Sequence, residues 1–154
     1  MKKLRWGVIG AGGIADRRTI PGMMLAKNAE LIAVMDINAE QVEKIRQKYG
    51  AKRGYTKEED LLADPEIDVV HVLTPNVAHC PITVAAFEAG KHVMCEKPMA
   101  INGEEAQKML DAARRTGKKL TIGYQNRYRP DSWYLKRACD AGELGEIYYA
   151  KAHA

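Results

Sequence analysis

The sequence predicts an α/β fold, a doubly wound parallel sheet with helices on both faces. Short apolar runs alternate with longer helical patterns along the chain, as in right-handed βαβ units. Residues 67–74 form a nearly continuous β-branched run, which is typical of a strand buried on both faces. A glycine-rich turn follows the first apolar run and opens a helix. At 154 residues, the chain has the length of one ordinary domain.

Side-chain caps and glycines mark the ends of the predicted helices. Asn38 with Gln41, and Thr56 with Glu59, have the spacing of capping boxes, in which the second side chain reaches back to the first residue. Asn102 is a third cap, and a glycine follows several of the helices. The expected strands cover residues 4–9, 30–35, 52–54, 67–74, 91–95, 119–124 and 146–153. The expected helices cover residues 14–27, 38–49, 56–63, 77–89, 102–116 and 131–141.

The composition is that of a globular protein without a nucleic-acid or membrane partner. The formal charge of +4 is mild, and the basic residues are scattered among acidic ones. No apolar run approaches the ~20 residues of a membrane span, and the start lacks the pattern of a signal peptide. Cys80, Cys95 and Cys139 lie far apart without a C-x-x-C pair, so no metal site and no disulfide framework are expected. These features predict a cytoplasmic protein.

The glycine-rich turn fits the pattern G-x-G-x-x-G/A of a Rossmann dinucleotide-binding site. Gly10 permits the tight turn, Gly12 lets the backbone approach a pyrophosphate, and Ala15 keeps the helix close to the strand. The first N–H groups of the helix, at Gly13 and Ile14, have no partner within the helix and would donate to the negatively charged pyrophosphate. We therefore expect all five residues to bind the cofactor; a glycine turn without a ligand is the alternative.

Asp36 ends the second strand, about twenty positions after the glycine pattern, where an acidic residue can accept hydrogen bonds from a ribose hydroxyl. The carboxylate would repel a 2′-phosphate, and no arginine follows it in residues 37–40. The sequence therefore predicts NAD as the cofactor rather than NADP. A helix-capping or solvated Asp36 is the alternative.

Three further polar segments follow predicted strands, where open α/β sheets bind their ligands. They are residues 74–76 (T-P-N) with His79, residues 96–98 (E-K-P), and residues 123–130. With the glycine turn, these segments resemble the glucose-fructose oxidoreductase, inositol dehydrogenase and rhizopine-catabolism family (Gfo/Idh/MocA). The resemblance covers essentially the whole chain, and the E-K-P segment after a strand is its most specific part.

The resemblance implies roles for the E-K-P segment. Lys97 would lie by the nicotinamide and the reacting hydroxyl, as a polarising or proton-relaying group suited to acid–base work. Glu96 would contact the cofactor side or orient its neighbour. The peptide bond before Pro98 would be cis.

The resemblance also assigns the remaining candidates. Thr74, Pro75 and Asn76 would line the groove between adenosine and nicotinamide. His79 would open the next helix and face the cleft as a second catalytic residue, although a cap or packing role is an equal alternative. Arg127 would reach the cofactor from the cleft edge, with a plain surface role as its alternative. His71 lies in the buried strand pattern and is expected to be structural.

Members of this family have a second α+β domain that supplies much of the substrate pocket and the common oligomer interface. We expect residues 1–123 to form the Rossmann domain, and residues 124–154 to form a connecting helix and the first strand of that second domain, most of which is lacking. A truncated chain and a natural single-domain relative are the alternatives, and the first is favoured because a lone strand leaves an exposed edge.

The reaction implied for the complete enzyme is oxidation of a secondary alcohol on a sugar, cyclitol or related polyol. We expect the isolated chain to bind nucleotide but to turn over poorly or not at all, and to form a homo-oligomer only with the second domain. Two other functions stay open. One is a non-catalytic dinucleotide-binding or sensing module, and the other is a biliverdin-reductase-like or imine reductase of the same fold.

Overall fold

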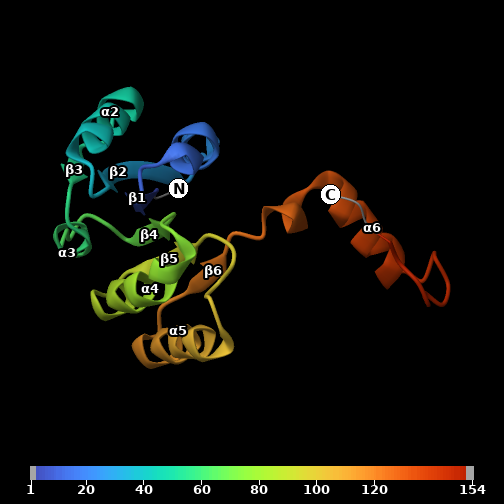
Figure 1. The fold of residues 1–154 in the computed structure, drawn as a ribbon. Coiled ribbons are helices and arrows are strands. Elements are labelled where there is room, and N and C mark those ends of the chain that lie inside the picture. The colour runs from blue at the N-terminus through green and yellow to red at the C-terminus, as the bar shows by residue number, and fades with distance from the viewer. Residues whose placement is uncertain (1–2, 152–154) are drawn as a thin grey trace. The chain divides into compact units, whose positions relative to one another are not determined.

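The fold is built on one parallel sheet. In residues 3–151, which the computed structural model describes, six strands pair in the order β3-β2-β1-β4-β5-β6 (Figure 1). The order reverses between β1 and β4, which is the switch point where doubly wound sheets bind their ligands. The strands are β1 Leu4–Ile9, β2 Ala29–Met35, β3 Arg53–Tyr55, β4 Val69–Val72, β5 His92–Cys95 and β6 Leu120–Ile122.

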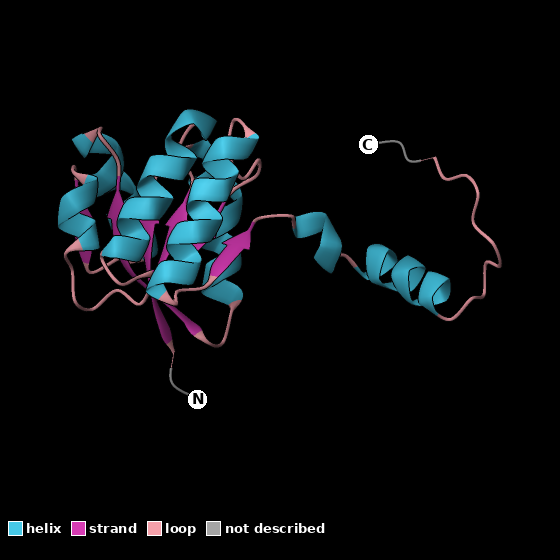
Figure 2. Ribbon diagram, turned by 90° about the horizontal axis from the view of Figure 1, so that it is seen from below, coloured by secondary structure: helices cyan, strands magenta, loops and turns pink. Residues whose placement is uncertain are grey.

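Helices connect the strands and cover both faces of the sheet (Figure 2). Val8 and Val34 pack with residues of α1 and α2 in one apolar cluster. Val70 and Val72 pack with residues of α3, α4 and α5 in the other. The helical elements are η1 Ala15–Thr19, α1 Ile20–Leu25, α2 Ala39–Tyr49, α3 Glu58–Leu62, η2 Asn76–Ala78, α4 His79–Glu88, α5 Gly103–Thr116, η3 Gln125–Tyr128 and α6 Pro130–Asp140. This arrangement confirms the predicted doubly wound α/β fold.

The first predicted helix forms, and it contains a π-helical turn, Ala15–Thr19, ahead of α1. Two other local expectations are wrong here. Thr56 does not cap α3, whose N-cap is Lys57 with no side-chain hydrogen bond. Residues 146–151 form no strand, since no neighbouring strand pairs with them among the described residues, and the last part of that predicted strand lies outside those residues.

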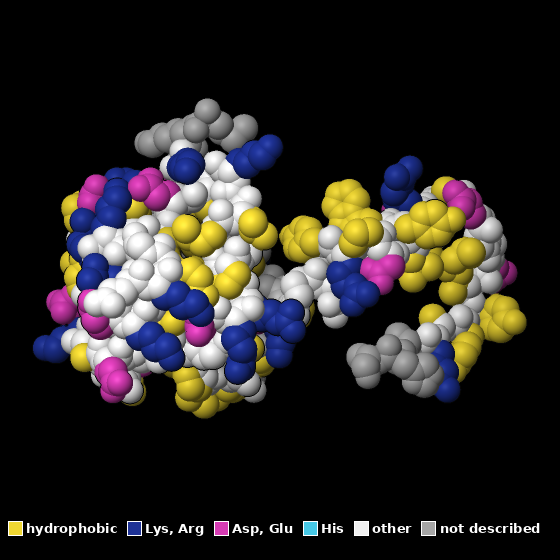
Figure 3. Space-filling model, turned by 90° about the horizontal axis from the view of Figure 1, so that it is seen from above, with side chains coloured by type: hydrophobic (Ala, Val, Ile, Leu, Met, Phe, Trp, Pro, Cys, Tyr) yellow, Lys and Arg dark blue, Asp and Glu magenta, His cyan; other side chains and the backbone are white. Residues whose placement is uncertain are grey.

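The chain divides into two compact units, Met1–Gly123 and Tyr124–Ala154. The second contains η3 and α6, and large apolar side chains are exposed on it (Figure 3). Trp133, Tyr134 and Leu135 have 58%, 73% and 56% of their surface exposed. None of the described helices is long and apolar enough to cross a membrane.

Backbone hydrogen bonds align the loops at the carboxyl edge of the sheet. After each of five strands, the first residue donates its N–H to the last residue of the strand beside it. The donor and acceptor pairs, 2.8–3.3 Å apart, are Asp36 to Tyr55, Gly10 to Met35, Leu73 to Ile9, Glu96 to Val72 and Gly123 to Cys95. The loops that follow these strands therefore begin side by side along one edge.

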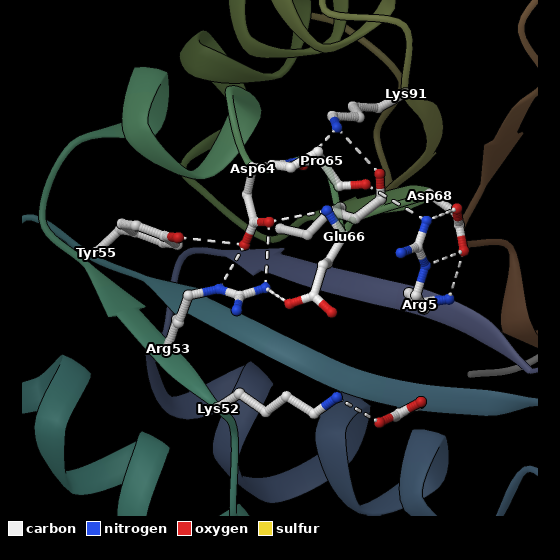
Figure 4. A network of polar contacts seen from close by, with 11 residues as sticks. Arg5, Lys52, Arg53, Tyr55, Asp64, Pro65, Glu66, Asp68 and Lys91 are labelled. Atoms are coloured by element: carbon white, nitrogen blue, oxygen red, sulfur yellow. Dashed lines mark hydrogen bonds and ion pairs between the residues drawn. The ribbon is translucent and has the colours of Figure 1, made fainter.

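The loop between α3 and β4, at the opposite edge, is held by charged side chains (Figure 4). The Asp64 carboxylate accepts from Arg53 Nε at 2.7 Å and from the Tyr55 hydroxyl at 3.1 Å. The buried Lys91 ammonium donates to the carbonyl oxygens of Asp64 and Ile67, at 2.6 and 3.0 Å. Each of these groups has a hydrogen-bond partner, so this network stabilises the fold and is no candidate for the functional site.

Replacement of Gly10 tests how closely the glycine loop approaches the loop after β4 at the carboxyl edge. Its φ is +96°, and a Cβ at this position would lie 2.8 Å from the carbonyl carbon of Leu73. We expect Gly10→Ala to lower the free energy of unfolding, by about 1–2 kcal/mol for the left-handed backbone and by roughly 1–3 kcal/mol for the clash. Urea unfolding followed by circular dichroism measures this change.

Gly12→Ala is the matched control. A Cβ at Gly12 would meet nothing within 4 Å, so this variant should unfold at the same urea concentration as the unaltered chain or at a slightly higher one. Equal stability of all three proteins would contradict the close approach of Gly10 to Leu73.

Candidate functional site

The glycine loop follows β1 at the switch point of the sheet. Gly12, Gly13 and Ile14 are exposed there, while Ala15 is buried against α1 and α2. The Arg17 guanidinium lies against Gly13, at 3.0 Å from the position of an added Cβ. Space is thus open at Gly12, as the approach of a pyrophosphate requires.

Two side chains of α2 anchor the π-helical turn after the glycine loop. The Tyr49 hydroxyl lies 2.5 Å from the Asp16 carbonyl oxygen, and the Lys48 ammonium lies 2.6 Å from the Asp16 carboxylate. The hydrogen bonds from Lys48 and Tyr49 lower the pKa of Asp16 below its ordinary value. The turn is therefore tied to the neighbouring helix. Short π-helical segments of this kind occur frequently at functional sites.

Asp36 lies beside the glycine loop, as the sequence predicts. Its Oδ2 accepts from the Ala11 N–H at 2.9 Å and its Oδ1 accepts from the Asn38 N–H at 3.1 Å. A carboxylate has about four lone-pair positions, so two remain for further donors. The half-buried Asp36 can therefore hold the loop and still accept hydrogen bonds from a ribose.

His79 connects two of the predicted site segments. Its ring Nε2 lies 3.0 Å from the Thr74 carbonyl oxygen, and its Nδ1 lies 2.8 Å from the Pro98 carbonyl oxygen. The residue is only 1% exposed at the start of α4. The imidazole is therefore buried between the T-P-N and E-K-P segments, and this geometry favours a positioning role over direct contact with a substrate in a cleft.

The E-K-P segment follows β5 with a cis peptide bond between Lys97 and Pro98. Glu96 lies against Gly123, where an added Cβ would be 3.1 Å from its Oε1, and its Oε2 accepts from the Lys97 N–H at 3.0 Å. The Lys97 side chain is exposed, and its ammonium has no hydrogen-bond partner among the described residues. This cation is thus available to a ligand at the carboxyl edge.

The other predicted site residues make no side-chain hydrogen bonds in the described part of the chain. The Thr74 hydroxyl is buried without a hydrogen-bond partner in the described part of the chain, and Pro75 and Asn76 are exposed. Arg127 belongs to the second unit, where its guanidinium lies 6.0 Å from the centre of the Tyr124 ring. The first unit therefore brings together every predicted site residue except Arg127, whose role stays a prediction.

Three residues of the site environment were missed by the sequence analysis as members of the site. Tyr49 holds the π-helical turn, Gly123 makes room for Glu96, and Gln41 donates to the Ala11 carbonyl oxygen at 2.7 Å. Gln41 does not complete the predicted capping box, because Asp36 accepts the Asn38 N–H instead. Only Gly123 carried a signal, since it opens the polar segment 123–130 that the sequence analysis placed at this edge.

The chain matches the profile of the oxidoreductase family with an NAD-binding Rossmann fold (GFO_IDH_MocA) over residues 4–124. It is 38% identical to the D-glucoside 3-dehydrogenase of Escherichia coli K12, over 98% of this chain and 43% of that protein. It is 37% identical to the 1,5-anhydro-D-fructose reductase of Ensifer adhaerens, over 96% of this chain and 44% of that protein.

A solved structure with the same fold is the WlbA dehydrogenase from Chromobacterium violaceum, in complex with NADH and UDP-GlcNAcA. The TM-score is 0.89 at 36% sequence identity, and the match covers 96% of this chain and 43% of that one. The chain therefore belongs to the Gfo/Idh/MocA oxidoreductases, and its residues 4–124 match the NAD-binding Rossmann fold of that family. It spans less than half the length of the relatives that it matches.

The bridging role of His79 can be tested by its replacement with leucine. His79→Leu removes both contacts to carbonyl oxygens, and we expect it to lower the free energy of unfolding by roughly 1–3 kcal/mol. Urea unfolding of the cofactor-free chain measures the change.

His71→Leu is the control, because this second buried histidine has an Nε2 without a hydrogen-bond partner among the described residues. His71→Leu removes a buried ring nitrogen that makes no hydrogen bond in the described part of the chain, so it should lower the free energy of unfolding less than His79→Leu does. If His79→Leu unfolds no more easily than His71→Leu, then His79 does not bridge the two segments.

Proposed function

We propose that this chain is the cofactor-binding half of an NAD-dependent dehydrogenase acting on a secondary alcohol of a sugar, cyclitol or related polyol. The observation that carries the proposal is the position of the Asp36 carboxylate beside the glycine loop at the switch point of the sheet. Relatives named for glucoside, anhydrofructose and inositol substrates support the substrate class.

The residues of the first unit divide into two groups in this proposal. Gly10, Gly12, Gly13, Ile14 and Ala15 admit the pyrophosphate, and Asp36 accepts hydrogen bonds from the adenosine ribose. Residues 74–76 and Glu96 line the way to the nicotinamide. The buried Thr74 hydroxyl without a partner fits a group that a ligand would complete.

Lys97 is the residue that we assign to the chemical step. A bound nicotinamide would supply the hydride acceptor. Lys97 would either polarise the reacting hydroxyl as an ammonium or, as the neutral amine, accept the hydroxyl proton and pass it to solvent. In this proposal, groups outside the first unit position the substrate, because the chain spans less than half the length of the relatives that it matches. We therefore infer that this chain alone binds nucleotide and turns over polyols poorly or not at all.

Cofactor titration tests the proposal. We expect NADH to bind with a dissociation constant at least about tenfold lower than that of NADPH, because the Asp36 carboxylate repels a 2′-phosphate. Isothermal titration calorimetry, or quenching of tryptophan emission, gives both constants. No binding of NADH at millimolar concentration, or tighter binding of NADPH, would contradict the proposal.

Asp36→Asn removes the charge with little change of shape, and it should bring the two dissociation constants closer together. Asp111→Asn, on the exposed surface of α5, is the control and should leave their ratio unchanged.

The position of Lys97 can be tested without turnover. If its ammonium lies by the nicotinamide, it disfavours the cationic ring of NAD⁺ relative to the neutral ring of NADH. Lys97→Met should then lower the ratio of the NAD⁺ and NADH dissociation constants about fivefold, since two unit charges ~4 Å apart in water interact by roughly 1 kcal/mol.

Lys108→Met, which removes an exposed lysine of α5, serves as the control for this ratio. The assignment of Lys97 fails if the two lysine variants give the same ratio as the unaltered chain.

A further inference from the structure

Ala11, between the first two glycines of the loop, is held by side chains on both of its backbone polar groups. Its N–H donates to Asp36 Oδ2 at 2.9 Å, and its carbonyl oxygen accepts from Gln41 Nε2 at 2.7 Å. The residue is fully buried, so water cannot replace these partners at low cost. The middle of the glycine loop thus depends on two side chains from outside it.

The two side chains are themselves held by Asn38. The Asn38 N–H donates to Asp36 Oδ1 at 3.1 Å, and the Asn38 Oδ1 accepts from the Gln41 N–H at 3.2 Å. Ala11, Asp36, Asn38 and Gln41 therefore form a closed ring of hydrogen bonds, which we call the Ala11 ring. It joins the loop after β1 to the loop after β2 and to the first turn of α2.

We propose that Gln41 is a positioning residue of the dinucleotide site, which holds the glycine loop in its binding conformation before the cofactor arrives. The inference rests on the proposed function, because it assumes that the loop receives a pyrophosphate. Gln41 contributes through Ala11 and need not touch the cofactor. Ordering the loop in advance removes part of the conformational cost of binding.

The chemistry of the ring requires a hydrogen-bond donor at position 41, and the Gln41 amide supplies it. The partner is a carbonyl oxygen, which can only accept, so the side chain must donate. A glutamate would place a carboxylate oxygen against the Ala11 oxygen, and a methionine of similar length would offer no donor. Asp36 alone cannot replace Gln41, because its carboxylate binds the opposite backbone group of Ala11.

Because Gln41 holds the Ala11 carbonyl oxygen, Asp36 can accept hydrogen bonds from two donors, the Ala11 N–H and a ribose hydroxyl. When a ribose hydroxyl donates to the Asp36 carboxylate, that carboxylate must share its charge between the ribose and the Ala11 N–H. The hydrogen bond from Gln41 to the Ala11 oxygen is independent of this exchange and keeps the loop in place. Gln41 therefore deepens the proposed cofactor site by separating the support of the loop from the recognition of the ribose.

The experiment compares Gln41→Met and Gln41→Glu with the unaltered chain. We expect the dissociation constant of NADH to rise about threefold to tenfold in Gln41→Met, as for the loss of one neutral hydrogen bond, and further in Gln41→Glu. The second readout is amide hydrogen exchange in the cofactor-free chain, measured by NMR. Exchange at the buried Ala11 N–H should accelerate in both variants, while exchange in β4 and β5 stays unchanged.

Gln47→Met is the matched control on the same helix. The Gln47 amide donates to Glu43 on the exposed side of α2, so this variant should alter neither readout. Unchanged NADH affinity in Gln41→Met, or unchanged exchange at Ala11, would overturn the inference about Gln41. If the unaltered chain itself binds no NADH, the proposed function fails instead, and the exchange readout still decides whether Gln41 holds the loop.

Discussion

The row of backbone hydrogen bonds along the carboxyl edge is the constraint on which the candidate site depends. Each bond joins the first residue after one strand to the last residue of the strand beside it, so the loops leave the sheet in a fixed order. Gly10 is the least replaceable member of the row, because its backbone lies against the carbonyl group of Leu73 with no space for a side chain. The glycine loop and the T-P-N segment are neighbours for this reason.

The charged groups at the two edges of the sheet differ in whether they already have hydrogen-bond partners. At the amino edge, Asp64, Arg53 and Lys91 satisfy one another and the backbone around them, which leaves no group for a ligand. At the carboxyl edge, Lys97 stays exposed and Asp36 keeps capacity to accept further hydrogen bonds. The charged groups at the first edge stabilise the fold, while those at the second are available for the cofactor, as expected at the switch point of a doubly wound sheet.

Features that depend on local spacing could be predicted from the sequence, and contacts across the fold could not. The glycine pattern, the Asn38 cap and the strand ahead of the E-K-P segment are local, and the structure contains all three. Spacing assigns Gln41 to a capping box because it cannot show that Asp36 takes the Asn38 N–H. Likewise, the apolar pattern of residues 146–151 indicates a strand, but a strand forms only beside a partner.

His79 and Gln41 illustrate how this domain prepares a site from irregular segments. Loops contain backbone groups that no strand or helix satisfies, and buried groups of this kind must find partners. The two ring nitrogens of His79 lie 2.8 and 3.0 Å from carbonyl oxygens in the loops after β5 and β4, and Gln41 donates to a carbonyl oxygen in the loop after β1. Because both side chains contact backbone carbonyl oxygens, they help to fix where other groups lie. The exposed residues, Lys97 and Gly12, can then meet a cofactor without first ordering the loops that carry them.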